Sequence, residues 1–190
     1  MSSRENILAA VLKNQPPLTT LPDISGFKVD ETDVTAKYTE VLTEIGGIVY
    51  SVETIEDIKA YIGKFFDIGK RIVTTIPELI DIAEICQKDV DPHSFNDVEL
   101  AVIKGRLAVA ENGAVWFTED VMGQRILPYI CQHLAVVVSQ DSLVSTMHDA
   151  YAKIAAEDYG FGGFIGGPSK TADIEQALVL GAHGPLSMTV

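Results

Sequence analysis

The sequence predicts an α/β domain with a mostly parallel sheet and helices on both faces. Short apolar runs alternate with longer amphipathic patterns from residue 30 onward, which is typical of successive βαβ units. The 190 residues are 47% hydrophobic and 22% charged, enough for one domain with a sizeable core. Asn112-Gly113 interrupts an alternating segment with a strong tight-turn signal, which predicts a short antiparallel insert there.

Residues 1–29 are predicted to form a helix and a proline-rich linker, and residues 30–190 a single α/β domain. Ser2 and Glu5 have the spacing of a capping box at the start of the helix. The apolar positions of the helix form one stripe: Ile7, Leu8, Val11 and Leu12. Three prolines and a glycine follow. A helix tethered in this way can pack on its own domain, on a second copy in a homo-oligomer, or on a partner.

Helices of the domain are predicted from apolar residues at helical spacing and from their end signals. Thr54 is a suitable N-cap, Pro77 suits the first position of a helix, and Gly46 and Gly181 are stop signals. The predicted helices cover residues 34–45, 55–66, 77–86, 124–130, 147–155 and 171–181. The predicted strands cover residues 47–52, 71–75, 133–139, 161–167 and 186–190, with alternating strands around the turn in residues 99–119.

Charge and cysteine content exclude several classes of function. The net charge of −13 disfavours binding to nucleic acid or to an anionic membrane surface. No apolar run approaches the ~20 residues of a membrane span or the ~7–15 of a secretory signal, so we expect a cytoplasmic protein. Cys86 and Cys131 are two thiols where an iron–sulfur cluster takes four, and we expect buried thiols rather than a disulfide. We expect no metal site in this chain.

The richest stretch for chemistry is the glycine-rich segment at residues 165–185. Gly166 and Gly167 permit close approach of a ligand to the backbone, and Ser169, Lys170 and Thr171 would stand at a helix start whose N–H groups favour anions. The alternative is a capped turn without a ligand, because Ser169 or Thr171 can cap the helix. The stretch is not a Walker A loop, since serine rather than glycine precedes the lysine.

Two further residues are candidates for catalysis. His183 lies between two glycines at the entrance of the last strand, where it can titrate, orient a substrate or simply be solvated. The predicted helix of about 15 Å separates it from Gly166–Thr171, so both line one site only if the loop folds back or another chain completes it. Glu111 precedes the Asn112-Gly113 turn and could serve as base, acid or nucleophile, or be a solvated turn residue.

The block "GGPSKTADIEQALVLGAHGP" closely resembles the signature of the LUD domain, and "AENG" matches a second block of that family. Over residues 30–190 the chain is similar to the lactate-utilization protein C family. The resemblance implies a fold like that of the NagB/RpiA/CoA-transferase group. It also implies a role in oxidising L-lactate to pyruvate beside two iron–sulfur proteins, with no cofactor in this chain and the clusters in those partners.

Three hypotheses of function follow. The first is an accessory component of lactate oxidation with a small anionic ligand in a cleft of Glu111, Gly166–Thr171 and His183. The second is an enzyme acting on a CoA thioester, sugar phosphate or similar metabolite, because Glu111-Asn112-Gly113 is similar to the nucleophile turn of some CoA-transferases. The third is a structural partner subunit. Relatives commonly carry arginine after HGP where this chain has Leu186, which removes one cation from that turn.

Overall fold

The computed structural model describes residues 2–23, 26, 33–172 and 178–190. The chain divides into two compact units, Met1–Asp30 and Glu31–Val190. The first unit contains helix α1 (Ser3–Lys13), which begins with the predicted capping box: Ser2 Oγ accepts the Glu5 N–H at 3.3 Å, and Glu5 Oε2 accepts the Ser2 N–H at 2.6 Å. The apolar stripe of α1 is exposed within this unit.

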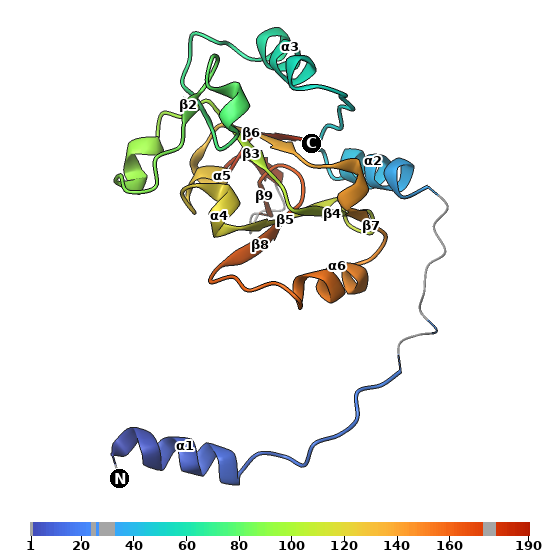
Figure 1. Ribbon diagram of the computed structural model, residues 1–190, viewed down its shortest axis with the longest axis vertical. Coiled ribbons are helices and arrows are strands. Elements are labelled where there is room, and N and C mark those ends of the chain that lie inside the picture. The colour runs from blue at the N-terminus through green and yellow to red at the C-terminus, as the bar shows by residue number, and fades with distance from the viewer. Residues whose placement is uncertain (1, 24–25, 27–32, 173–177) are drawn as a thin grey trace. The chain divides into compact units, whose positions relative to one another are not determined.

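The second unit is built on a parallel five-stranded sheet, as predicted (Figure 1). Its order is β11-β6-β3-β1-β2, with every neighbouring pair parallel. The strands are β1 (Ile72–Thr74), β2 (Glu84–Ile85), β3 (Leu100–Lys104), β6 (His133–Val137) and β11 (Ser187–Thr189). In place of the strand predicted at residues 47–52, Ile48 forms an isolated parallel bridge with Thr189 at the edge of this sheet.

The antiparallel part is larger than the sequence predicted. A four-stranded mixed sheet has the order β7-β4-β5-β8, with β4–β5 and β5–β8 antiparallel and β4–β7 parallel. Its strands are β4 (Leu107–Val109), β5 (Ala114–Thr118), β7 (Leu143–Val144) and β8 (Gly162–Ile165). The β4–β5 hairpin contains the predicted turn. The glycine-rich strand β8 pairs antiparallel with β5 instead of joining the parallel sheet. Gly162 leaves room for the Trp116 ring in this pairing, since a Cβ there would lie 2.4 Å from it.

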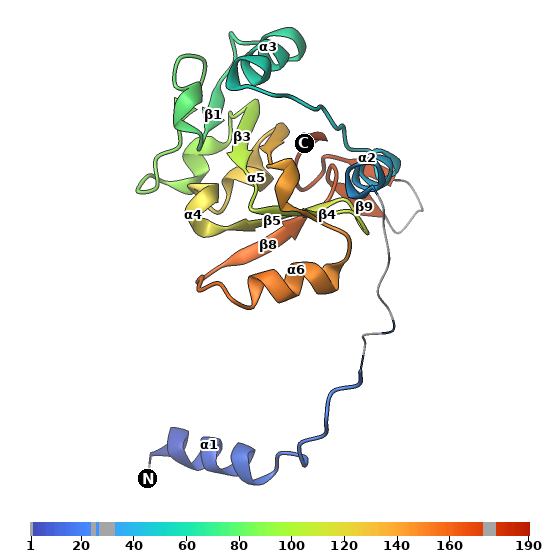
Figure 2. The same cartoon turned by 45° about the vertical axis from the view of Figure 1, so that its right-hand side comes forward.

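Helices cover both sheets on their outer faces, and a shared core lies between the sheets. The helices of this unit are α2 (Val34–Glu44), α3 (Ile55–Phe65), α4 (Glu119–Met122), α5 (Leu127–Ile130) and α6 (Met147–Ile154). Helix α3 packs on one face of the parallel sheet, and α6 packs on the outer face of the four-stranded mixed sheet (Figure 2). Side chains from α2, α4 and α5 join both sheets in the central core. Among the described residues no helix is long and apolar enough to span a membrane.

Two predicted helices are wrong. Residues 77–86 form a short 3-10 turn, η2 (Pro77–Leu79), followed by strand β2. The Cys86 N–H donates to the Thr74 carbonyl oxygen at 2.8 Å, and this hydrogen bond to β1 stabilises the segment as a strand of the parallel sheet. The segment predicted as the last helix has strand β9 (Lys170–Ala172) at one end and β10 (Leu178–Leu180) at the other. These strands pair antiparallel, and the middle of that prediction, residues 173–177, lies outside the described residues.

Leu42 of α2 is the side chain on which we expect the central core to depend. It is fully buried and packs so close to Gly47 that a Cβ there would lie 2.5 Å from its Cδ1. We predict that Leu42→Ala lowers the free energy of unfolding by about 2–5 kcal/mol, measured by urea denaturation, because the cavity cannot close fully. Leu18→Ala is the control, since Leu18 is fully exposed; equal midpoints for the two variants would contradict the prediction.

Candidate functional site

The two halves of the glycine-rich segment lie side by side. The Ser169 N–H donates to the Pro185 carbonyl oxygen at 2.9 Å, and the Gly181 N–H donates to the Ser169 carbonyl oxygen at 3.0 Å. Strands β9 and β10 continue this pairing. The expectation that a 15 Å helix separates the two halves is therefore wrong. We call the loop Gly166–Thr171 together with the turn Gly181–Pro185 the signature surface.

The side chains that could bind an anion on the signature surface are exposed. Lys170 is exposed at the start of β9, and His183 is exposed in the turn. The backbone is less available than predicted, because the Ser169 N–H is already bonded and Lys170–Ala172 is a strand rather than a helix start. Anion binding at this surface would therefore depend on side chains, and ligand binding by Gly166, Gly167, Ser169, Lys170 and Thr171 stays a prediction.

Gly167 has a structural explanation that needs no ligand. Its φ is +72°, a value that favours glycine, and a Cβ there would lie 3.1 Å from the Ile45 carbonyl oxygen. Gly46, with φ +89°, faces Pro168 and Lys170 from the same end of α2. The loop thus packs backbone to backbone on the C-terminal end of α2. Gly166 differs, because it is exposed and its nearest contacts are at ordinary distances.

Glu111 is exposed in the turn between β4 and β5, and its carboxylate binds the start of helix α6. Its Oε2 accepts the Met147 N–H at 2.7 Å, and its own N–H donates to the Ser145 carbonyl oxygen at 3.0 Å. Negative charge at a helix N-terminus is favourable, so this contact explains the carboxylate without a substrate. The turn lies close to the signature surface, since Gly166 is next to Ala114.

A polar cluster occupies the amino ends of three parallel strands next to the signature surface. His133 Nδ1 is 2.7 Å from Ser187 Oγ, and His133 Nε2 is 4.0 Å from Glu99 Oε1. Lys70 Nζ lies 2.7 Å from the same Glu99 oxygen. The cluster links the starts of β3, β6 and β11. Sequence reasoning placed His133 at a strand boundary, but its partners are distant in sequence and gave no local signal.

Both cysteines are free, as expected for structural thiols. Cys131 is buried, and burial raises the pKa of its thiol to about 12; burial also raises the pKa of Cys86. Thiols in this state are poor nucleophiles and poor metal ligands at neutral pH. Within the described ranges there is no group of three or more His, Cys, Asp or Glu side chains placed to hold a metal ion.

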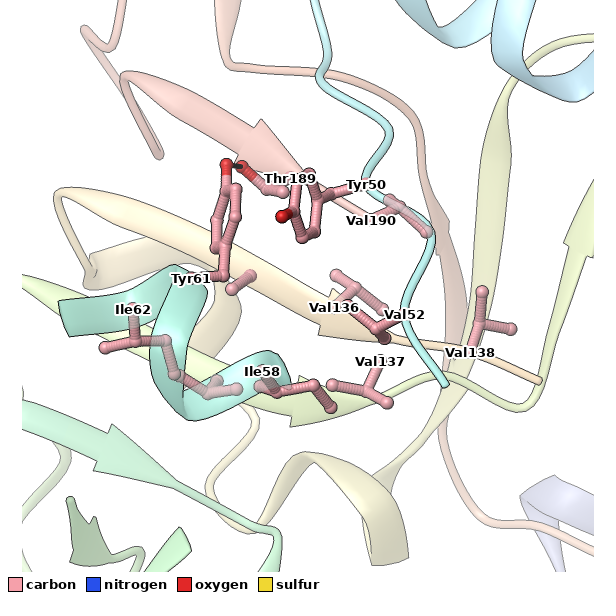
Figure 3. Close-up of a pocket in the computed structure, with 12 residues that line it drawn as sticks. Tyr50, Val52, Ile58, Tyr61, Ile62, Val136, Val137, Val138, Thr189 and Val190 are labelled. Atoms are coloured by element: carbon pink, nitrogen blue, oxygen red, sulfur yellow. Dashed lines mark hydrogen bonds between the residues drawn. The ribbon is translucent and has the colours of Figure 1, made fainter. Parts of the chain in front are cut away.

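Two adjoining cavities lie elsewhere, where β6 and β11 end, and the predicted site residues do not line them. Their volumes are about 70 and 120 Å³, and they share the walls Tyr50, Val52, Val138 and Val190. Figure 3 shows the first of them, with side chains of α3 facing the strand ends. A more open cavity of about 660 Å³ lies beside α4 and includes Glu119, Asp120 and Arg125. Local sequence patterns did not indicate these cavities, because the helices and strands that line them are distant in the chain.

Comparison with known proteins identifies the family of this chain from a match over its C-terminal part. Residues 86–190 match the LUD domain. The chain belongs to the LUD domain family. The matched part contains both blocks of the signature surface and the Glu111 turn, whereas α2, α3 and β1 precede it.

Two proteins similar to this LUD protein show how far the likeness extends. Over 103 residues it is 31% identical to "Lactate utilization protein C" of Oceanobacillus iheyensis, and the aligned part is 50% of this chain and 40% of that relative. The chain thus matches less than half the length of this curated relative. A crystal structure of a DUF162 family protein from Deinococcus radiodurans superimposes with a TM-score of 0.66 over 86% of this chain and 98% of the other, at 15% identity, which shows a shared fold.

Gly167 packs tightly against Ile45 in this LUD domain, whereas the neighbouring Gly166 does not, so substitutions at the two glycines should differ in their effect on stability. We predict that Gly167→Ala lowers the free energy of unfolding by about 1–3 kcal/mol, because a side chain is strained at positive φ and meets the Ile45 carbonyl. Gly166→Ala, one residue earlier, should change stability far less because it has room for a Cβ. Chemical denaturation of both variants measures this. Equal losses would contradict the packing explanation.

Proposed function

We propose that this LUD protein is an accessory component of a lactate utilization system that oxidises L-lactate to pyruvate. Its family and its similarity to a protein named "Lactate utilization protein C" support the proposal. In this proposal two iron–sulfur partner proteins carry the electrons, because this chain has two cysteines and a cluster usually takes four thiolates.

The signature surface is where we propose that a small anionic metabolite, such as lactate or pyruvate, binds. The observation that carries this proposal is the β9–β10 hairpin, which brings the Lys170 loop and the His183 turn together. The Lys170 ammonium can pair with a carboxylate, and a ring N–H of His183 can donate a hydrogen bond to it. Leu186 packs against Gly181 and adds no charge, so binding would depend on the side chains of Lys170 and His183.

An enzymatic role with Glu111 as nucleophile or base toward a CoA thioester or sugar phosphate is the less favoured proposal. The Glu111 carboxylate would have to leave the Met147 N–H before it could attack a substrate, and that contact stabilises the start of α6. We therefore propose that Glu111 has a structural role and stabilises the turn beside the signature surface.

Growth of a gene-deletion strain tests both parts of the proposal. We predict that the host without this gene, and without a paralogue, fails to grow on L-lactate, and that the full chain restores growth. The double variant Lys170→Gln/His183→Gln should restore it poorly, because it removes both candidate anion contacts while leaving the backbone pairing intact. Lys153→Gln, in the exposed last turn of α6, is the matched control and should restore growth fully.

The deletion strain tests the role in lactate utilization, and the double variant tests the anion site on the signature surface. Normal growth of the deletion strain on L-lactate would reject the role in lactate utilization. Full complementation by the double variant, at equal protein level, would leave the role in place and reject the anion site on the signature surface.

A docking role for α1 is a second proposal, supported by its uncovered apolar face. Ile7, Leu8, Val11 and Leu12 are between 55% and 71% exposed within their unit. Such a stripe is typical of a helix that packs on another protein surface. We predict that the protein without residues 1–15 loses co-purification with the two iron–sulfur partners, whereas a charge variant on the opposite, polar face of the helix, Lys13→Gln, keeps it. Undiminished capture by the truncated protein would reject the docking role.

A further inference from the structure

The adjoining cavities at the ends of β6 and β11 form one groove, which we call the carboxyl-edge groove. Val138 directly follows β6 and Val190 directly follows β11, so both belong to the carboxyl ends of the parallel strands. Ligands of open α/β sheets bind at this edge. The signature surface lies at the opposite edge, because Leu186 precedes β11 and pairs with Gln132, which precedes β6. A five-residue strand separates the two edges by about 16 Å.

One end of the groove is apolar. Ile58, Tyr61 and Ile62 of α3 face valines of β6, and the Tyr50 ring packs on Tyr61 at 4.5 Å between centroids (Figure 3). The one hydroxyl pair recorded there is Tyr61 with Thr189, 3.3 Å apart. Because these hydroxyls can satisfy each other, this end suits an alkyl group.

The other end of the groove offers polar groups without charge. Thr35, Thr39, Ser51 and Gln140 line it together with Tyr38. Gln140 Nε2 donates to Thr35 Oγ1 at 3.1 Å, and Thr39 Oγ1 donates to the Thr35 carbonyl oxygen at 2.8 Å. None of the side chains that line either cavity is charged. An anionic ligand would lose hydration here without gaining a cationic partner, so the groove favours an uncharged ligand over an anionic one.

Tyr38 provides the observation that points to a missing partner. The residue is 2% exposed, and its hydroxyl has no hydrogen-bond partner among the residues that the structure describes. Burying a hydroxyl without a partner is unfavourable, and native structures seldom leave one unsatisfied. Burial raises the pKa of Tyr38, so its hydroxyl stays protonated and remains a donor.

We propose that the carboxyl-edge groove binds a small uncharged carbonyl compound, whose oxygen accepts the Tyr38 hydroxyl and whose short alkyl chain lies against α3. Both cavities are smaller than the ~300–1,000 Å³ typical of drug-sized ligands, which limits the compound to a few carbons or to the end of a longer molecule. The site is separate from the signature surface and its ligand is neutral rather than anionic. Thr35, Tyr38, Tyr50 and Ser51 lie outside the part that matches the LUD domain.

Titration of the full chain with butyramide, followed by backbone amide chemical shifts, tests the proposal. We expect saturable shifts at groove residues such as Tyr50 and Val138. Butyrate, which has the same shape and a negative charge, should bind at least about tenfold more weakly. Tyr38→Phe should weaken butyramide binding about tenfold by removing one hydrogen bond, without lowering the unfolding midpoint, because the hydroxyl loses no partner within the protein.

Two more variants keep the result interpretable. Tyr151→Phe removes the hydroxyl of an exposed tyrosine on α6 and should bind as the wild type does. Val52→Glu places a carboxylate on the exposed wall shared by the two cavities and should abolish the shifts. The proposal is overturned by the absence of a saturable shift, which would leave water as the partner of Tyr38. Equal binding of butyrate, unchanged binding by Tyr38→Phe, or shifts confined to the signature surface would also overturn it.

Discussion

The C-terminal end of helix α2 is packed so closely that two turns from other parts of the chain can approach it only as glycine backbone. Gly113 and Gly167 both have positive φ, and a Cβ on either would lie 3.0–3.1 Å from backbone atoms of Leu42 or Ile45. A single helix end thus holds the β4–β5 hairpin and the β8–β9 loop in place. Leu42, from the same turn of the helix, is fully buried in the core between the two sheets. The glycines of the motif therefore support the architecture first.

This constraint changes how the signature surface can work. Its loop backbone is occupied by packing and by pairing with the turn at Gly181–Pro185, so little of it is free to bind a ligand. What the surface presents is a pair of exposed side chains, Lys170 and His183, beside the paired strands β9 and β10. Glu111 is held close by through the start of α6. A weak, side-chain-based anion site suits an accessory subunit better than a buried catalytic centre would.

The two edges of the parallel sheet differ in chemistry. The amino edge carries charged and titratable groups, including the linked side chains of Lys70, Glu99, His133 and Ser187. The carboxyl edge carries the uncharged groove. Because the strands between them are buried, the two proposed ligands would not compete directly for one site.

Local patterns in the sequence determined the fold class, the Ser2–Glu5 capping box, the Asn112-Gly113 hairpin and the two signature blocks, because each depends on residues a few positions apart. They failed where long-range pairing overrides helical spacing: Cys86 is drawn into the parallel sheet, and Ser169 pairs with Gly181 and Pro185, so helical patterns became strands. The groove could not be predicted for the same reason, since Tyr38, Tyr50 and Val138 meet only when distant segments pack together. Sequence by itself determined the fold class, the ends of the capped helices and which family motifs are present. Only the tertiary structure decided which of them are adjacent, because adjacency depends on burial and hydrogen bonding between segments remote in the chain.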